Sequence, residues 1–402
     1  MLHCHRRDMI DAAAQSHSRV LLIGFAGALA MACSQGFGRF LYTPVLPGMI
    51  SDLSLKASDA GLIAAGNFAG YLLGAILAAY GWANGREKLV ALGGMLATGL
   101  LLLAMAMTRA VEVFILIRFL AGMASALAMI FTSQIVIGHA TAAGREDVQS
   151  LHFAGVGVGI AVSSLLVFVI GSLLHGEGAS WQAEWIVGAV FVFIAFVFVA
   201  RVLPSGPPRT AVATVEPPIR WRMPLVLLTI AYGLFGFGYV ITATFLITIV
   251  RMADAGALVE CLAWFITGSA SAISLYIWRP VAKLTGHRWT FVMALAIEVV
   301  GVLASVLLPP VVGALFGGLL FGLTFMVVTA YGLQLGRQFS PHSPRRVFSF
   351  MTAAFGIGQI TGPLVGGWVA QFTGNFTLPT ILAAAALGIA MLLMVPVARM
   401  RD

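Results

Sequence analysis

The sequence predicts an all-helical, polytopic membrane protein with twelve transmembrane helices in two pseudo-symmetric six-helix bundles. Of its 402 residues, 60% are hydrophobic and only 9% are charged, whereas a soluble domain carries roughly 25% charge. The apolar runs are continuous and about 20 residues long, which is the length of a helix that crosses a bilayer core. The chain also repeats with an offset of 200 residues, since Gly36-Phe37-Gly38 returns as Gly236-Phe237-Gly238.

Six apolar segments make up the first half: 20–43, 60–82, 89–107, 111–137, 149–173 and 183–203. A barrel strand would instead show about 10 alternating residues. The first segment follows several arginines, as a signal peptide does. We interpret it as an uncleaved span, because segment 224–250 repeats its core pattern. The third and sixth segments are nearly featureless Ala, Leu, Val and Phe, which is typical of helices that face lipid.

Six further segments make up the second half: 224–250, 257–281, 289–308, 312–336, 347–370 and 377–398. Between the halves, residues 204–222 contain Pro207-Pro208 and Pro217-Pro218 and are predicted to be a linker. The halves are therefore expected at 1–203 and 223–402. The 45 glycines suit close helix contact in lipid, where small residues let backbones approach.

The distribution of Lys and Arg predicts the orientation in the membrane. With the N-terminus in the cytoplasm, eighteen of the twenty-one basic residues outside the spans lie on the cytoplasmic side. The other side receives Lys56, Arg109 and Arg251. The positive-inside rule then places both termini and the linker in the cytoplasm, and we expect an integral protein of the inner cell membrane.

Several function classes are excluded. There is no Gly-x-Ser-x-Gly, His-Glu-x-x-His or phosphate loop, so we expect no enzyme, no cofactor and no direct use of ATP. The three cysteines show no metal spacing, and His3-Cys4-His5 is a weak cluster, so no metal site is predicted. The net charge of +8 follows membrane topology, so no nucleic-acid partner is expected.

Short motifs agree with the twelve spans and the repeat. Arg118-Phe119-Leu120-Ala121-Gly122 in the fourth segment resembles the fourth-helix motif of the major facilitator superfamily. Gly155, Gly157 and Gly159 resemble its glycine-rich fifth-helix signature. The loop Gly85-Arg86-Glu87-Lys88 looks like a remnant of its conserved loop between spans two and three, but it lacks the usual acidic residue.

A narrower resemblance lies in the first two segments. The run from Gly36 to Pro47, Gly-Phe-Gly-Arg-Phe-Leu-Tyr-Thr-Pro-Val-Leu-Pro, is similar to the first helix of the YbfB/YjiJ-type branch. The run from Ala65 to Gly74 agrees with it. The resemblance covers essentially the whole chain and implies the major facilitator fold and a transport function, without naming a substrate.

Polar residues inside spans are the candidates for a solute site, because charges at bilayer depth are costly and usually functional. They fall on helical stripes in segments that, by the resemblance, line the cavity. The candidate substrate-binding residues are Gln35, Arg39, Tyr42, Asn67, Tyr71, Arg118, His152, Tyr239, Trp264, Tyr331, Gln334 and Gln359.

Structural roles compete with these assignments. Arg39 and Arg118 could each bind a ligand or brace neighbouring helices through backbone carbonyls. His152 begins its segment and could lie at the interface. Gln35 and Gln359, like other amides, could simply join helices. Glu298, on the ninth segment, could carry a coupling proton or be paired with a neighbouring helix.

The sequence therefore predicts a secondary transporter of a small solute, with the bilayer and a small-molecule substrate as partners, a possible coupling proton and a monomeric state. Because Arg39 and Arg118 are the basic side chains within spans, an organic anion is the expected solute class. A neutral or aromatic solute is the alternative if both arginines are satisfied by protein groups. The alternative function is a transporter-fold sensor or scaffold that binds a ligand without translocating it.

The positive-inside count yields a topology prediction. Reporter domains fused after residue 402 or inserted in 204–222 should be active only in the cytoplasm, because eighteen of twenty-one basic residues then lie inside. Fusions in the loop that contains Arg109 should give the reverse. A linker reporter that is active outside the cell would contradict this orientation.

Overall fold

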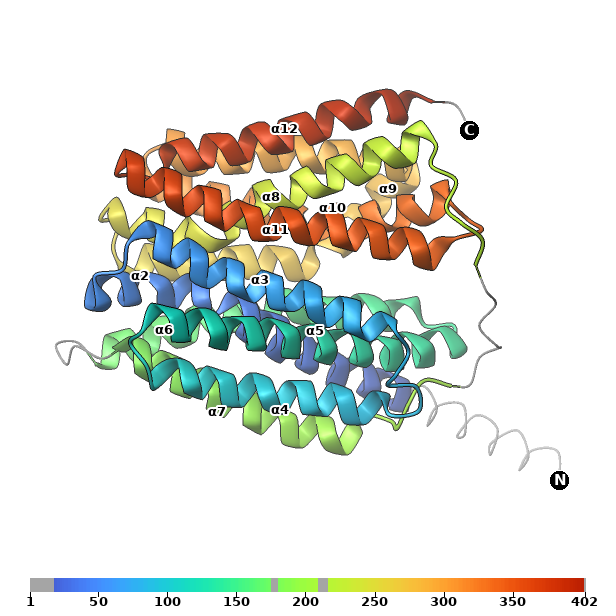
Figure 1. The fold of residues 1–402 in the computed structure, drawn as a ribbon, viewed down its shortest axis with the longest axis horizontal. Coiled ribbons are helices and arrows are strands. Elements are labelled where there is room, and N and C mark those ends of the chain that lie inside the picture. The colour runs from blue at the N-terminus through green and yellow to red at the C-terminus, as the bar shows by residue number, and fades with distance from the viewer. Residues whose placement is uncertain (1–17, 175–179, 209–215, 401–402) are drawn as a thin grey trace, which may run out of the picture.

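The computed structural model describes residues 18–174, 180–208 and 216–400, and in these ranges it contains helices and loops without a strand. Eleven of the described helices are long and apolar enough to cross a membrane. They lie side by side along the long axis of the molecule (Figure 1). The prediction of an all-helical, multi-pass membrane protein is therefore confirmed.

The helices follow the predicted segments closely. The first runs over Ser18–Leu53 and includes the π-helix η1 (Ala32–Phe40) and α2 (Tyr42–Leu53). The first half continues with α3 (Ala57–Ala79), α4 (Glu87–Ala106), α5 (Val111–Ala142), α6 (Glu146–Leu173) and α7 (Ser180–Val202). The second half consists of α8 (Met223–Met252), α9 (Ala257–Leu307), α10 (Pro310–Phe339), α11 (Pro344–Thr373) and α12 (Thr377–Arg399).

The helix count differs from the expected twelve because two predicted segments, 257–281 and 289–308, lie in one element. Helix α9 has 51 residues, and its backbone leaves helical geometry at Gly286, with φ 79° and ψ 162°. Glycine adopts this positive φ without a Cβ clash. The chain turns at Gly286, and the helical parts on either side follow each other without a loop between them.

The two ends of the bundle are distinguished by the linker. At the linker end, where α7 ends and α8 begins, Glu216 accepts hydrogen bonds from the backbone N–H groups of Arg345 and Arg346 at the start of α11. Such a carboxylate satisfies donors that a helix N-terminus leaves free. The opposite end carries the turn between α2 and α3 and the start of α7 (left in Figure 1).

The 200-residue repeat is visible in helix packing. A Cβ added to Gly122 of α5 would lie 1.9 Å from the carbonyl oxygen of Asn67 in α3. At the same offset, a Cβ on Gly322 of α10 would lie 2.3 Å from the carbonyl oxygen of Thr267 in α9. Both contacts require glycine because the helix backbones touch. The repeat therefore preserves the same close approach in each half.

The largest contacts between the halves are those of α3 with α11, α6 with α9, and α2 with α8. Glycines form the first two contacts, since added Cβ atoms would lie 2.3 Å from the Pro363 oxygen at Gly61 and 2.4 Å from the Gly268 oxygen at Gly157. In the third, Thr43 donates a hydrogen bond of 2.5 Å to the carbonyl oxygen of Ala243, its own repeat mate.

These backbone contacts predict a stability effect. Gly70→Ala should lower the unfolding temperature in detergent, because the new Cβ would lie 1.7 Å from the Phe119 oxygen and α3 would have to move away from α5. Overpacking of this kind costs about 1–3 kcal/mol. Gly93→Ala in α4 is the control, since no atom lies within 4 Å of its added Cβ. Equal melting temperatures for the two variants would contradict the packing described.

Candidate functional site

The charged centre of the candidate site is Arg39, which lies in the π-helix η1 and is 8% exposed. Its Nη1 donates to Oε1 of Gln35 at 3.0 Å, and Gln35 Nε2 donates to the carbonyl oxygen of Ser125 at 3.3 Å. Its buried Nε and Nη2 have no hydrogen-bond partner among the described residues. One edge of the guanidinium is thus fixed, and two nitrogens remain able to donate.

Aromatic rings surround the Arg39 guanidinium. Its Cζ lies 4.1 Å from the ring centroid of Tyr71, 5.0 Å from that of Phe68 and 5.6 Å from that of Phe40. Cations within about 6 Å of a ring face are attracted by its quadrupole. These contacts hold the cation in place without using its N–H groups, and no carboxylate among the described residues forms a salt bridge with it.

Arg118 has a different role, because its donors bind the backbone. Its Nη1 and Nη2 donate to the carbonyl oxygens of Gly38 and Arg39 at 2.9 and 3.0 Å. Arg118 also lies 5.1 Å from the Tyr42 ring, and its own carbonyl accepts a hydrogen bond from Asn67.

The π-helix changes the expected stripe of Gln35, Arg39 and Tyr42. Bonds in a π-helix connect residues five apart, and such segments are frequent at functional sites. The Gln35–Arg39 bond is present, but the Tyr42 hydroxyl donates to the carbonyl oxygen of Ala60 at 3.0 Å. Tyr42 therefore joins α2 to α3, whereas Tyr71 takes the place beside Arg39.

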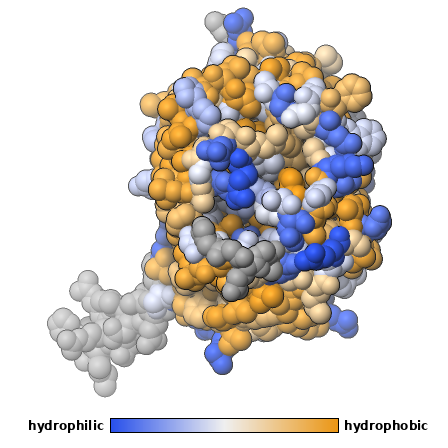
Figure 2. All heavy atoms as spheres, turned by 90° about the vertical axis from the view of Figure 1, so that its left-hand side faces the viewer, coloured by the Kyte–Doolittle hydropathy of each residue, from blue (hydrophilic) through white to orange (hydrophobic). Residues whose placement is uncertain are grey.

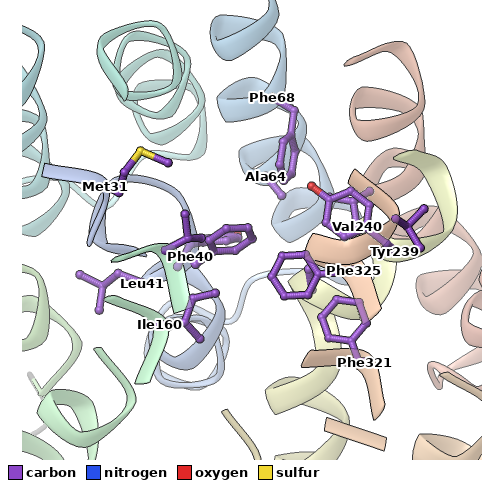
Figure 3. Close-up of a cluster of buried hydrophobic side chains, with 14 of the residues drawn as sticks. Met31, Phe40, Leu41, Ala64, Phe68, Ile160, Tyr239, Val240, Phe321 and Phe325 are labelled. Atoms are coloured by element: carbon purple, nitrogen blue, oxygen red, sulfur yellow. The ribbon is translucent and has the colours of Figure 1, made fainter. Parts of the chain in front are cut away.

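Aromatic side chains of the second half face this centre. The rings of Tyr239, Phe325 and Phe355 are nearly parallel, with centroids 6.1 and 5.5 Å from Tyr239. From the first half, Phe40 approaches Phe325 edge-on at 6.4 Å. Figure 3 shows Phe40 and Phe68 across from Tyr239, Phe321 and Phe325. The two halves thus meet through aromatic groups beside Arg39.

Polar groups of the second half lie at the rim of this aromatic cluster. Gln359 Nε2 donates a short hydrogen bond to the Tyr239 hydroxyl, and Gln359 Oε1 has no partner among the described residues. Trp264 is fully buried, its ring centroid lies 6.3 Å from that of Phe40, and its Nε1 has no partner there either. The second half thus has one unpaired donor, Trp264 Nε1, and one unpaired acceptor, Gln359 Oε1, at the aromatic cluster beside Arg39.

Three sequence candidates lie elsewhere. His152 is fully buried, and its Nε2 lies 2.8 Å from Ser133 Oγ, so it joins α6 to α5. The Tyr331 ring lies 5.3 Å from that of His287, and Gln334 Nε2 lies 3.3 Å from His287 Nε2. Tyr331 and Gln334 therefore lie at the linker end with a residue of α9.

Two acidic residues that were not among the sequence candidates are also buried. Glu184 of α7 is 5% exposed and Glu260 of α9 is 7% exposed, and both oxygens of the Glu260 carboxylate accept hydrogen bonds from Arg251. The sequence signal was the charge itself, since both residues lie just inside the predicted segments 183–203 and 257–281. Glu298 is fully buried and neither carboxyl oxygen has a partner among the described residues.

The described residues hold no group of three or more His, Cys, Asp and Glu side chains placed to bind a metal. The His3-Cys4-His5 sequence lies outside the described residues.

Comparison with known proteins identifies relatives. The family described as "Uncharacterised MFS-type transporter YbfB" matches residues 30–395. A chloramphenicol resistance protein of Streptomyces lividans is 27% identical over 361 residues, which cover 85% of this chain and 88% of that protein.

Solved structures share the fold. The nucleoside transporter NupG superposes with a TM-score of 0.69 at 14% identity, over 94% of this chain and 98% of that one. A bacterial homologue of the human lysosomal transporter Spinster, inward-facing and unoccupied, gives a TM-score of 0.63 at 15% identity, over 95% of this chain and 94% of that one.

The two arginines should respond differently to substitution. Arg118→Gln should lower the thermal stability of the detergent-solubilised protein, because the carbonyls of Gly38 and Arg39 lose their donors. A buried unpaired carbonyl costs about 1–3 kcal/mol. Arg39→Gln is the matched control and should unfold near the wild-type temperature, since Arg39 holds one side-chain acceptor. A stable Arg118→Gln protein beside an unstable Arg39→Gln protein would reverse these roles.

Proposed function

Because this chain belongs to the YbfB-type family of MFS transporters, it is a secondary transporter and not an enzyme, and we propose that its solute is a small organic anion bound by Arg39. The observation that carries this proposal is a buried guanidinium with two unpaired nitrogens and no carboxylate partner among the described residues. Holding an arginine at the bilayer centre costs about 2.5–3.5 kcal/mol on insertion scales. A bound carboxylate would offset part of that cost through charge-assisted hydrogen bonds.

The surrounding rings favour a solute with a flat, apolar part. Tyr71 and Phe68 cover Arg39, and the Tyr239 cluster lies opposite. Gln359 Oε1 and Trp264 Nε1 supply an acceptor and a donor for polar groups of the same solute. The named relatives include a nucleoside transporter and a chloramphenicol resistance protein.

A neutral aromatic solute is the second candidate, and the Arg118 geometry favours it. Arg118 is committed to two carbonyls, so it contributes structure rather than ligand charge. The anion hypothesis therefore depends on Arg39 alone. Tyr42, Asn67, His152, Tyr331 and Gln334 have contacts within the protein that support structural roles for them.

We further propose that transport proceeds by rocking of residues 1–203 against 223–402, connected by the linker 204–222. On this proposal α9 comprises two spans that meet at Gly286, because its 51 residues are about twice the length needed to cross the bilayer core. That gives twelve spans and places the linker end in the cytoplasm and the opposite end outside. We retain the inner membrane and the monomeric state as parts of the proposal.

Nothing in the family favours a sensor or scaffold that binds without translocating. A transporter without a nucleotide-binding loop moves solutes downhill or by ion coupling. Counterflow in vesicles with a panel of carboxylates and neutral aromatic compounds separates the two solute classes.

Substitution of Arg39 tests the anion site. For a carboxylate found by counterflow, Arg39→Gln should weaken half-saturation about 10- to 100-fold, since hydrogen bonds to charged groups contribute about 1.5–3 kcal/mol. Arg39→Lys should recover only part of this affinity because it lacks the planar fork. Arg109→Gln, an exposed arginine at the opposite end, is the control. Unchanged affinity and rate in both Arg39 variants would refute the role of Arg39.

A further inference from the structure

A cavity lies between the two halves at the end of the bundle opposite the linker. It has a volume of about 270 Å³ and is lined by residues of α2, α6 and α7 from the first half and of α8 and α9 from the second. Figure 2 looks onto this end, where hydrophilic residues gather near the centre of a largely hydrophobic surface. The cavity is separate from the Arg39 centre, since none of the aromatic residues around Arg39 lines it.

The charges in this cavity do not balance. Its lining contains Glu184 from the first half and Arg251 and Glu260 from the second. Arg251 donates from both Nε and Nη2 to the Glu260 carboxylate, so its charge is committed to that partner. Arg251 is the basic residue in the described lining. Two carboxylates therefore share one cation.

Glu184 is the carboxylate without a partner. It is 5% exposed, lines the cavity, and makes no hydrogen bond or salt bridge within the described residues. An isolated carboxylate is so costly to bury that it normally takes up a proton instead. One monovalent cation bound at Glu184 would therefore compensate its charge.

In the described parts of the neighbouring elements, no second cation is paired with Glu184. From α2, Asp52 accepts a hydrogen bond from Trp181 Nε1 and lies 3.7 Å from the exposed Arg109. From α6, Ser164 donates to the carbonyl oxygen of Cys261 in α9. A carbonyl oxygen can accept a hydrogen bond from a neutral carboxylic acid but not from a carboxylate, which has no proton to donate.

We propose that Glu184 is a proton-binding site whose occupancy closes this end of the transporter. With the proton bound, Glu184, Arg251 and Glu260 together are neutral, and the halves can bury them. When the proton leaves, the cluster carries one negative charge in a water-poor site, and separation of the halves hydrates it. The site is independent of the solute that Arg39 binds, although it rests on the rocking of the halves.

Geometry couples this proton to the motion, because the three groups are divided between the halves. Glu184 moves with α7, whereas Arg251 and Glu260 move together with α8 and α9. Opening this end would admit water to Glu184 and let it exchange its proton with that side. Proton binding and opening are then reciprocally linked.

The experiment measures the distance between the halves at this end in purified full-length protein. Spin labels are placed by Ala110→Cys and Phe372→Cys, which are exposed positions outside the cavity. Cys4 and Cys261 are replaced by serine, the second because it lines the cavity, while Cys33 is buried outside it. In the wild type, raising the pH should shift the population from the shorter to the longer distance. A wild-type distribution that is constant over pH would refute the proton site, whatever the Arg39 variants show in transport.

Substitutions of the two carboxylates, Glu184 and Glu260, test where the proton binds. Glu184→Gln should stay at the shorter distance at every pH. Glu260→Gln should lose the pH-dependent shift as well, because Arg251 becomes available to Glu184. The infrared carbonyl band of protonated carboxylic acids should contain a component that titrates with pH in the wild type, and this titrating component should be absent in Glu184→Gln. The measurement tests the site without relying on motion.

Glu298→Gln is the matched control, because Glu298 is a fully buried carboxyl that does not line this cavity. It should keep the pH-dependent shift. Loss of the shift in Glu298→Gln together with its retention in Glu184→Gln would assign the proton to Glu298 and overturn the proposal. A shift produced by Na⁺ at constant pH would show that the cation is not a proton and would overturn it too.

Discussion

Two hydrogen bonds from Arg118 to the carbonyl oxygens of Gly38 and Arg39 hold the irregular part of the first helix in place. In a bilayer every backbone polar group must be satisfied by the protein. With the carbonyls of Gly38 and Arg39 bound, η1 can present Arg39 to the interior while Gln35 fixes one edge of its guanidinium. The position of the Arg39 cation thus depends on a second cation, Arg118, which binds the backbone.

The two halves share a framework but differ in chemistry. Gly122 on Asn67 and Gly322 on Thr267 repeat one helix contact. At the centre, however, Arg39 of a π-helix corresponds to Tyr239 of a regular α-helix. The first half therefore contributes the charged group, Arg39, and the second half contributes the stacked aromatic rings around Tyr239. A solute that spans the interface would contact both kinds of surface, and each half would bind only part of it.

Periodicity and composition were sufficient to predict the helices, the repeat and the burial of Arg39, Asn67 and Arg118. They could not reveal the π-helix, because all nine residues of η1 are buried and no exposed face marks its period. They predicted the two parts of α9 as the separate segments 257–281 and 289–308, but not that the turn between them is made at Gly286 alone. Glu184 was not among the candidates because a charge near a segment end is normally solvated, whereas in the structure it is buried in a cavity lined by both halves.

The glycine contacts between the halves have a kinetic consequence. Gly61 rests on the Pro363 carbonyl and Gly157 on that of Gly268, so the helix backbones meet directly at these two points. Interdigitated side chains would have to disengage before one half could turn against the other, with a loss of dispersion energy. A direct backbone contact keeps most of that attraction while it slides. If the halves rock as proposed, the barrier would therefore depend less on these glycine contacts than on the polar links and the aromatic contacts, such as Phe40 with Phe325, that cross the interface.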